Sequence, residues 1–200
     1  EIASCLVGSE MCIRDRTEVV HMKKLIAVLG SSRPGSISMK AAEAFIKGAE
    51  EAGYSTVVFN VNDMNLKGCT GCKSCRSNGV DCVINDDMRN YLNELHSADA
   101  LLITSPNYYA QIAGPMITFM NRHYCLSNPD KTSRIRNGIK LSAIFSQGAP
   151  KDYPKYTPVY NWYTGTFISK GMNLYFKRVI GGDSDLDAVC LETYNAGRLL

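Results

Sequence analysis

The sequence predicts a doubly wound α/β domain with a five-stranded parallel sheet and helices on both faces of the sheet. Three observations predict this fold. Strand-like and helix-like apolar periods alternate along the chain from Met22 onward. The strands are short and almost continuously apolar, which is typical of strands buried on both faces. The chain also offers five strand–helix units rather than the eight that a closed α/β barrel needs.

Each predicted strand is a short apolar run that ends at a turn signal. The run Leu25–Leu29 stops at Gly30-Ser31-Ser32, and the run Asp99–Thr104 is apolar throughout its interior. The five strands are expected at residues 25–29, 55–61, 99–104, 139–145 and 174–180.

The predicted helices follow the strands and have recognisable ends. Ser38 is a suitable N-cap for the first helix, and Gly53 follows its last residue. Asp86 and Asp87 supply the cap and the first-turn charge of the second helix. Pro115 suits the first turn of the third helix. The five helices are expected at residues 38–52, 86–97, 114–124, 158–170 and 183–200.

The composition indicates a globular domain and gives no reason to expect a membrane span or a nucleic-acid partner. The chain of 200 residues is long enough for one domain with a core, and 45% hydrophobic and 20% charged residues are ordinary for a globular protein. No apolar run approaches the ~18 residues of a membrane span. The formal net charge of +3, without a block of Lys and Arg, gives no reason to expect nucleic acid as a partner.

Residues 1–21 differ from the rest of the chain because they show no sustained apolar period. The stretch Cys5–Arg16 resembles translated sequencing-adapter sequence, and His21-Met22 resembles a cloning junction before the first strand. We therefore expect residues 1–21 to be a non-native or disordered appendage and residues 22–200 to form the domain. A genuine N-terminal element is the alternative.

Ligands of an open parallel sheet bind beyond the carboxyl ends of its strands, and the first loop expected there is Gly30–Ser38. It precedes a helix whose N-terminus favours an anion. Ser31, Ser36 and Ser38 offer hydroxyl groups in this loop. Arg33 adds a positive charge, so the loop suits a phosphate monoester, although it lacks the Gly-Lys-Ser/Thr of a P-loop. The alternative is a polar turn with a serine N-cap.

Two further loops are expected at the same edge of the sheet. Ser105–Pro115 combines a restrained backbone at Pro106 with the flat side chains of Tyr108 and Tyr109. Its backbone amides could bond the edge of a planar heterocycle, and the alternative is a tyrosine-rich turn used only for packing. The third loop, Ser146–Ala149, is small enough for its backbone to approach a ligand closely.

Four short motifs carry a family resemblance. They are Gly-Ser-x-Arg at 30–33 with serines at 36 and 38, Ser-Pro-x-Tyr at 105–108, Gly-Pro-Met at 114–116 and Asn-Arg at 121–122. Through them, nearly all of residues 22–200 resemble the NADPH-dependent FMN reductase family of flavodoxin-like proteins, and most closely the branch that includes iron–sulfur flavoproteins. The sequence departs from the family at Ile37, where Asn is frequent, and at Thr118 and Asn121, where Lys and Asp are usual.

The resemblance implies a non-covalently bound FMN. Its phosphate would be held by Ser31, Arg33, Ser36 and Ser38. Its isoalloxazine ring would be held by Pro106, Asn107, Tyr108, Tyr109, Ser146, Gln147 and Gly148.

Four of the eight cysteines gather in one loop. Cys69, Cys72 and Cys75 are separated by two residues each, and Cys82 follows. Three thiolates at this spacing could surround one face of an iron–sulfur cube, with a fourth from just beyond. The spacing also resembles the cysteine motif of iron–sulfur flavoproteins, which implies a 4Fe–4S cluster. Reduced thiols without metal, a redox disulfide and a zinc site remain open, because related flavin reductases carry a similar loop and need not hold a cluster.

We expect an FMN-dependent oxidoreductase that transfers electrons from NAD(P)H through the flavin to a small acceptor, such as a flavin, a quinone or a nitro compound. One alternative is an iron–sulfur flavoprotein that carries electrons and works with ferredoxin. The other is a non-enzymatic binding module that has lost the flavin. No catalytic residue is assigned, because the cofactor supplies the chemistry.

The aromatic stretch Tyr153–Tyr163 could pack in the core, or form a subunit interface that helps to cover the flavin. A homodimer or homotetramer is therefore expected. A reduced cysteine loop and the lack of a secretion signal indicate the cytoplasm. Neither nucleic acid nor a membrane is expected as a partner.

Overall fold

Five parallel strands form the main sheet of the computed structural model, which describes residues 22–200. They lie in the order β2-β1-β3-β5-β6. The strand order reverses between β1 and β3, because the chain adds β2 on one side of β1 and then continues with β3 on the other side. The strands are β1 (Lys23–Leu29), β2 (Tyr54–Asn60), β3 (Ala100–Tyr108), β5 (Lys140–Ser146) and β6 (Asn173–Ile180). This is the flavodoxin-like order, which confirms the predicted fold, and ligands of such sheets bind near the reversal. The predicted appendage lies outside the described residues.

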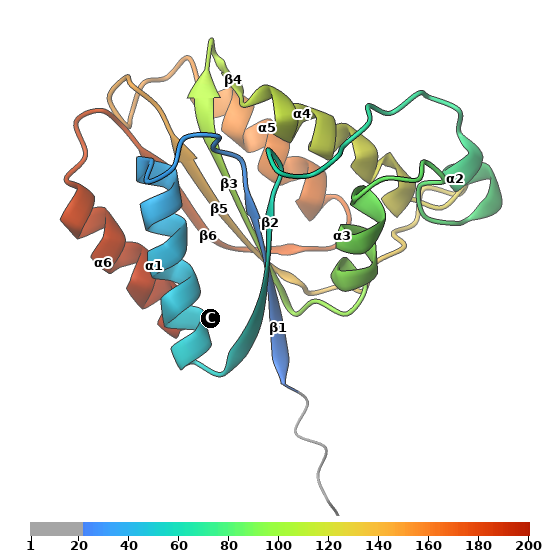
Figure 1. The fold of residues 1–200 in the computed structure, drawn as a ribbon, viewed down its shortest axis with the longest axis horizontal. Helices are drawn as coiled ribbons and strands as arrows, with labels where there is room; N and C mark the ends of the chain where they lie inside the picture. The colour runs from blue at the N-terminus through green and yellow to red at the C-terminus, as the bar shows by residue number, and fades with distance from the viewer. Residues whose placement is uncertain (1–21) are drawn as a thin grey trace, which may run out of the picture.

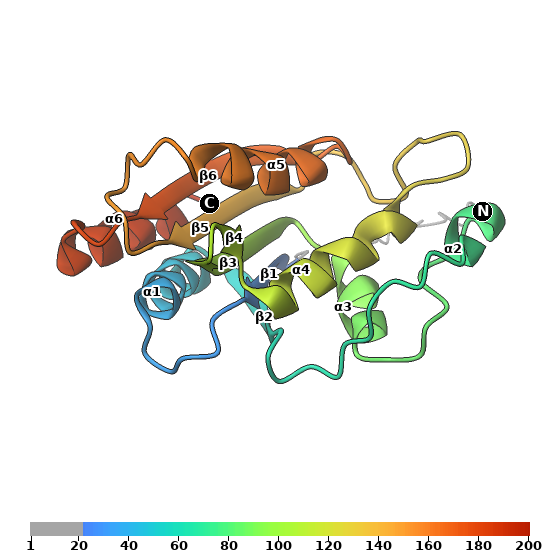
Figure 2. The same cartoon turned by 90° about the horizontal axis from the view of Figure 1, so that it is seen from above.

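Side chains of the central strands alternate between two cores. Leu25, Ala27 and Leu29 belong to the core beneath one helix pair, whereas Ile26 and Val28 belong to the core on the opposite face. The first face carries α1 (Ile37–Glu51) and α6 (Leu186–Arg198), and the second carries α3 (Met88–Leu95), α4 (Gly114–Asn121) and α5 (Thr157–Ile168). Figures 1 and 2 show these two layers on either side of the sheet. Burial on both faces is the reason that the central strands β1, β3 and β5 are almost continuously apolar.

No helix within residues 22–200 is both long and apolar enough to cross a membrane.

The first helix begins earlier than predicted. Ser36, not Ser38, is its N-cap: Ser36 has an extended backbone, and its hydroxyl accepts a hydrogen bond from the Met39 N–H at 3.4 Å. Gly35 precedes it with a φ of +63°, a turn conformation that glycine adopts easily. Because the turn is complete at Gly35, Ser38 lies inside the first helical turn, where it is fully buried.

The third strand is longer than predicted and ends in a hairpin. It continues through Pro106 to Tyr108 and pairs with the short antiparallel strand β4 (Gln111–Ile112). Tyr109 and Ala110 form the two-residue turn, and both have positive φ, at 52° and 66°. Two central residues with positive φ are typical of the tight turn that matches the twist of a hairpin, although glycine or asparagine usually fills it.

Other parts of the fold also differ from the prediction. A short helix, α2 (Ser74–Asn78), lies inside the cysteine loop. The predicted helix at 114–124 divides into α4 and a 3₁₀ helix, η1 (Arg122–Leu126). The last helix begins at Leu186, because the Asp185 carboxylate caps it by accepting from the N–H groups of Asp187 and Ala188.

The cysteine loop is closed at its neck by a buried ion pair. Arg122 donates to the Lys67 carbonyl at 2.7 Å and to both carboxylate oxygens of Asp86, at 2.5 and 3.1 Å. The Lys67 N–H donates to the same Asp86 carboxylate at 2.9 Å. The side chains of Arg122 and Asp86 are both fully buried. Residues 67–86, which contain all four cysteines of the loop, are thus joined at their two ends.

Burial by itself would raise the pKa of Asp86, but the hydrogen bonds from Arg122 and the Lys67 N–H, with the charge of Arg122, hold this pKa below its ordinary value. A carboxylate with a lowered native pKa stabilises the fold above its unfolded-state pKa and loses that contribution as the pH falls.

We predict that Asp86→Asn lowers the free energy of unfolding at pH 7 by about 3–5 kcal/mol, because it leaves the Arg122 charge buried and unpaired. Between about pH 5 and pH 3, the free energy of unfolding should also fall less in the variant than in the wild type. Urea denaturation across this range measures both effects. Asp63→Asn, at an exposed carboxylate, is the control and should follow the wild type. If the free energy of unfolding of Asp86→Asn falls with pH as steeply as that of the wild type, the prediction is contradicted.

The helices α1 and α6 pack closely through two glycines. A Cβ at Gly48 would overlap the Tyr194 carbonyl oxygen, and a Cβ at Gly197 would overlap the Phe45 carbonyl oxygen. Each glycine therefore allows the backbone of the other helix to approach.

We predict that Gly48→Ala lowers the free energy of unfolding by about 1–3 kcal/mol, because the added methyl group forces α1 and α6 apart. Gly165→Ala is the matched control, since Gly165 also lies within a helix but has open space around its Cβ position. That control should raise the free energy of unfolding by about 0.5–1 kcal/mol. Thermal and urea denaturation measure the free energy of unfolding of both variants. An equal change in Gly48→Ala and Gly165→Ala would contradict the close contact of α1 and α6 as its cause.

Candidate functional site

A cavity of about 190 Å³ lies where four loops meet at the carboxyl ends of the strands. These loops follow β1, β3, β5 and β6, at the top of the sheet in Figure 1. The cavity is lined by Ser31, Arg33, Ser36, Ile37, Pro106, Asn107, Tyr108, Ser146, Gln147, Gly148, Gly181 and Gly182. The structure therefore brings together every residue predicted for the FMN site except Ser38 and Tyr109. It adds Ile37 and the pair Gly181-Gly182.

The first loop places hydroxyl groups and one cation at the amino end of α1. A Cβ at Gly30 would lie 2.6 Å from the Thr104 carbonyl oxygen, so glycine is needed where β1 leaves the sheet beside β3. Ser31 Oγ accepts from the Arg33 N–H at 3.2 Å, and the Arg33 carbonyl accepts from the Ser36 N–H at 3.2 Å. The loop is thus a tight turn against the helix N-terminus.

The donor set of this loop suits a phosphate monoester. Ser31 and Ser36 provide hydroxyl groups, Arg33 provides a guanidinium, and the first N–H groups of α1 face its amino end. Ser38 does not line the cavity: it is fully buried, and its hydroxyl lies 3.4 Å from that of Ser36. Ser38 can therefore act on a ligand only through Ser36.

The second loop is the β3–β4 hairpin, and Ser105 holds its base. Ser105 Oγ donates to the Pro106 carbonyl at 2.9 Å and accepts from the Ala113 N–H at 3.0 Å. Tyr108 is half exposed at the cavity, whereas Tyr109 is fully exposed at the hairpin turn and does not line the cavity. The left-handed backbone of Tyr109 is sparsely populated for a non-glycine residue, a kind of strain that gathers at functional sites.

The third and fourth loops pack against each other through their backbones. A Cβ at Gly182 would overlap the Gly148 carbonyl oxygen, which accounts for a glycine after β6. Gln147 donates from its backbone N–H to the Ile180 carbonyl at 2.9 Å. The Gly-Gly pair after the last strand was visible in the sequence, and it is the signal by which this fourth loop could have been included in the predicted site.

A buried tyrosine links the second and third loops from below. Tyr160, in α5, accepts from Asn107 Nδ2 at 3.0 Å and donates to Gln147 Oε1 at 2.6 Å. Its ring stacks on Phe145 with 4.5 Å between the ring centroids. Burial raises the pKa of Tyr160, so the hydroxyl stays protonated near neutral pH. In the sequence this tyrosine is one member of the aromatic stretch Tyr153–Tyr163, and no local signal predicts its place beneath the cavity.

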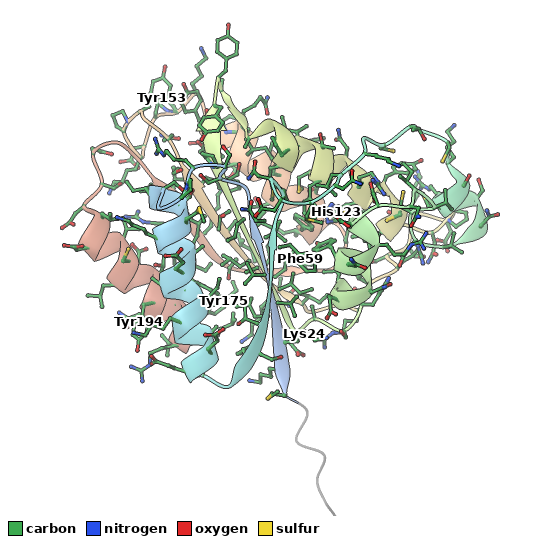
Figure 3. The ribbon with its side chains drawn as sticks, in the orientation of Figure 1. Lys24, Phe59, His123, Tyr153, Tyr175 and Tyr194 are labelled. Carbon is green, nitrogen blue, oxygen red and sulfur yellow. The ribbon has the colours of Figure 1, made fainter. Side chains whose placement is uncertain are left out.

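The cavity lining offers binding rather than acid–base chemistry. Among the described residues that line it there is no carboxylate, imidazole or thiol. His123 lies elsewhere, in the core on the α3–α4 side of the sheet (Figure 3). Burial lowers the pKa of His123 to about 4, and its Nε2 is hydrogen-bonded to the Tyr91 hydroxyl at 2.9 Å. It is thus a neutral core residue.

The cysteine loop is separate from the cavity, and Figures 1 and 2 place α2 at the far side of the molecule from α1 and α6. Cys69 and Cys72 are exposed, Cys75 is buried and Cys82 is partly buried, and none of them forms a disulfide. Hydrogen bonds from Ser74 and Thr70 lower the pKa of Cys72, whereas burial raises the pKa of Cys75.

Thiols are the donor class that an iron–sulfur cluster requires. Within residues 22–200, however, no three cysteine, histidine or acidic side chains are arranged to hold one metal ion. The predicted ligand set therefore has suitable chemistry, but the described arrangement does not assemble a metal site.

The chain is similar to known proteins both in sequence and in fold. The sequence model for NADPH-dependent FMN reductase matches residues 23–147. An iron–sulfur flavoprotein of Archaeoglobus fulgidus is 31% identical over 99 residues, which cover 50% of this chain and 44% of that protein. The chain thus spans less than half of that relative. An iron–sulfur flavoprotein of Methanosarcina thermophila is 23% identical over 171 residues, which cover 85% and 88% of the two chains.

Solved structures share the fold. An azoreductase from Bacillus anthracis superposes with a TM-score of 0.70 at 17% identity, covering 90% of this chain and all of that one. An FMN-dependent NADH-azoreductase from the same organism, solved in complex with FMN, superposes with a TM-score of 0.66 at 16% identity, covering 89% and 97%. On the match over residues 23–147, this chain belongs to the NADPH-dependent FMN reductase family.

Proposed function

We propose that the cavity binds FMN and that the protein is an FMN-dependent oxidoreductase, with NAD(P)H as electron donor and a small molecule such as a quinone, a flavin or a nitro compound as acceptor. The observation that carries the proposal is the convergence of the predicted residues on one cavity with a cation and a helix N-terminus at one end. Family membership and the FMN-bound structural neighbour support it.

In this proposal the chain binds and orients the cofactor. Ser31, Arg33 and Ser36 would hold the phosphate, because they combine a charge with hydroxyl donors at the start of α1. The hairpin from Pro106 to Tyr108 and the loop from Ser146 to Gly148 would hold the ring. Bound FMN would supply the redox chemistry by accepting a hydride and passing electrons onward. The chain would contribute position and exclusion of water, since no acid or base is found among the lining residues within 22–200.

An electron carrier with an iron–sulfur cluster is the second candidate. The spacing of Cys69, Cys72, Cys75 and Cys82 and the names of the two relatives favour it. Interaction with the Cys82 thiol is among the causes that raise the pKa of the buried Arg122 guanidinium, and a cation at this position would favour an anionic group in the loop. Ferredoxin would then be a partner. The cysteines would have to move together to bind a cluster, because their described arrangement does not assemble a site.

We also propose that the protein is a homodimer or homotetramer that acts in the cytoplasm. Trp162 is 70% exposed and Tyr153 38% exposed, which supports a role for part of the aromatic stretch in subunit contact. Figure 3 places Tyr153 at the edge of the sheet where the cavity loops lie and Lys24 at the opposite edge. The free cysteines agree with a reducing compartment.

We predict that Arg33→Ala weakens FMN binding by about 1–3 kcal/mol, roughly five- to 150-fold in Kd, because it removes a charge-assisted hydrogen bond to the phosphate. Quenching of FMN fluorescence during titration measures the Kd. Arg89→Ala removes an exposed arginine of α3, away from the cavity, and should bind FMN like the wild type. An unchanged Kd in Arg33→Ala would reject the phosphate role of this loop.

Iron analysis and an absorption spectrum of protein reconstituted without oxygen with FMN, iron and sulfide separate the candidates. The reductase predicts flavin bands that NADPH bleaches, with no stoichiometric iron. The carrier predicts about four irons per chain and a broad additional shoulder, both lost in Cys75→Ser. Cys190→Ser changes a cysteine outside the loop and should retain the wild-type iron content. A chain that takes up neither group would contradict both candidates and favour a binding module.

A further inference from the structure

A line of hydrogen bonds with a fixed direction runs beneath the cavity. It starts at the Pro150 carbonyl, which can only accept, and Gln147 Nε2 donates to it at 2.5 Å. This bond fixes the orientation of the Gln147 amide, because its NH₂ group must face Pro150. Gln147 Oε1 therefore faces the other way, toward Tyr160.

Tyr160 continues the line of hydrogen bonds with the same order of donor and acceptor. Its hydroxyl proton is committed to Gln147 Oε1, at 2.6 Å, so the hydroxyl oxygen can only accept from a further neighbour. That neighbour is Asn107, whose Nδ2 donates at 3.0 Å. The tyrosine is 1% exposed and its ring stacks on Phe145, so the hydroxyl has little freedom to move away.

The line of hydrogen bonds fixes the orientation of the Asn107 amide, and Asn107 lines the cavity. Its NH₂ group is turned to Tyr160, so its Oδ1 points elsewhere and is available as an acceptor. Within residues 22–200, no donor is hydrogen-bonded to this Oδ1. Without the Tyr160 hydroxyl, the amide could rotate and present either its oxygen or its NH₂ group to a ligand.

The oxidised isoalloxazine ring has a single N–H group, at the imide N3, and an amide oxygen is a suitable acceptor for it. We propose that Tyr160 is a positioning residue that holds Asn107 Oδ1 as the acceptor for this imide N–H. The inference rests on the proposed binding of FMN and specifies which part of the ring meets the hairpin. Asn107 would touch the ligand, and Tyr160 would act only through Asn107.

The test compares FMN with N3-methyl-FMN, in which the imide hydrogen is replaced. The measured quantity is the ratio of the two Kd values, from fluorescence titrations of the full chain. In the wild type N3-methyl-FMN should bind more weakly. In Asn107→Ala and in Tyr160→Phe the ratio should fall by about three- to tenfold, the range for one neutral hydrogen bond.

Tyr54→Phe is the matched control. Tyr54 is also a buried tyrosine, and its hydroxyl donates to the Leu200 carbonyl at 3.2 Å on the opposite side of the sheet from α5. It should lose a comparable hydrogen bond without changing the ratio. If circular dichroism shows that Tyr160→Phe is unfolded, Gln147→Leu replaces it. That variant frees the Tyr160 proton to turn toward Asn107 and should lower the ratio in the same way.

The ligand ratio distinguishes a positioning role from a general loss of stability, which would weaken both ligands equally. A ratio within twofold of the wild-type value in either Asn107→Ala or the Tyr160 variant would overturn the inference and leave the binding of FMN intact. Failure of the wild type to bind FMN would instead overturn the proposed function, and the inference with it.

Discussion

The site depends on one constraint, which is that parallel strands all end at the same edge of the sheet. Loops that are far apart in the sequence therefore meet beyond β1, β3, β5 and β6. Their approach is close because glycines stand where a side chain would overlap a neighbouring backbone, as at Gly30 beside Thr104 and at Gly182 beside Gly148. The cavity is thus a product of backbone packing, and its polar groups are attached to a rigid frame.

Two chemically different features are built on this frame. Among the described residues that line the cavity, Arg33 is the one charged group and there is no acid or base, which suits a cofactor that supplies its own chemistry. The cysteine loop projects from the opposite end of the molecule, and its neck is held by the buried pair of Arg122 and Asp86. The hydrogen bonds that close the neck use none of the cysteine side chains. The stability of the domain and the contents of the loop can therefore be measured separately.

The fold and most of the cavity lining could be predicted from the sequence, because apolar periods and loop composition are local signals. The N-cap of the first helix was predicted two residues late, since two serines with equal capping chemistry, Ser36 and Ser38, lie close together. The hairpin after β3 was missed because Tyr109 and Ala110 rarely adopt left-handed conformations. The role of Tyr160 could not be predicted, because it depends on a contact between residues 53 positions apart.

We propose that the turn around Arg33 binds the phosphate of a flavin nucleotide while the other loops hold its ring. Comparison of FMN with riboflavin, which has the same ring and no phosphate, tests it most directly. Titration of the wild-type chain should give a riboflavin Kd at least about tenfold higher than that of FMN, because the charge-assisted hydrogen bonds of the phosphate are lost. Equal affinity for the two flavins would contradict the account.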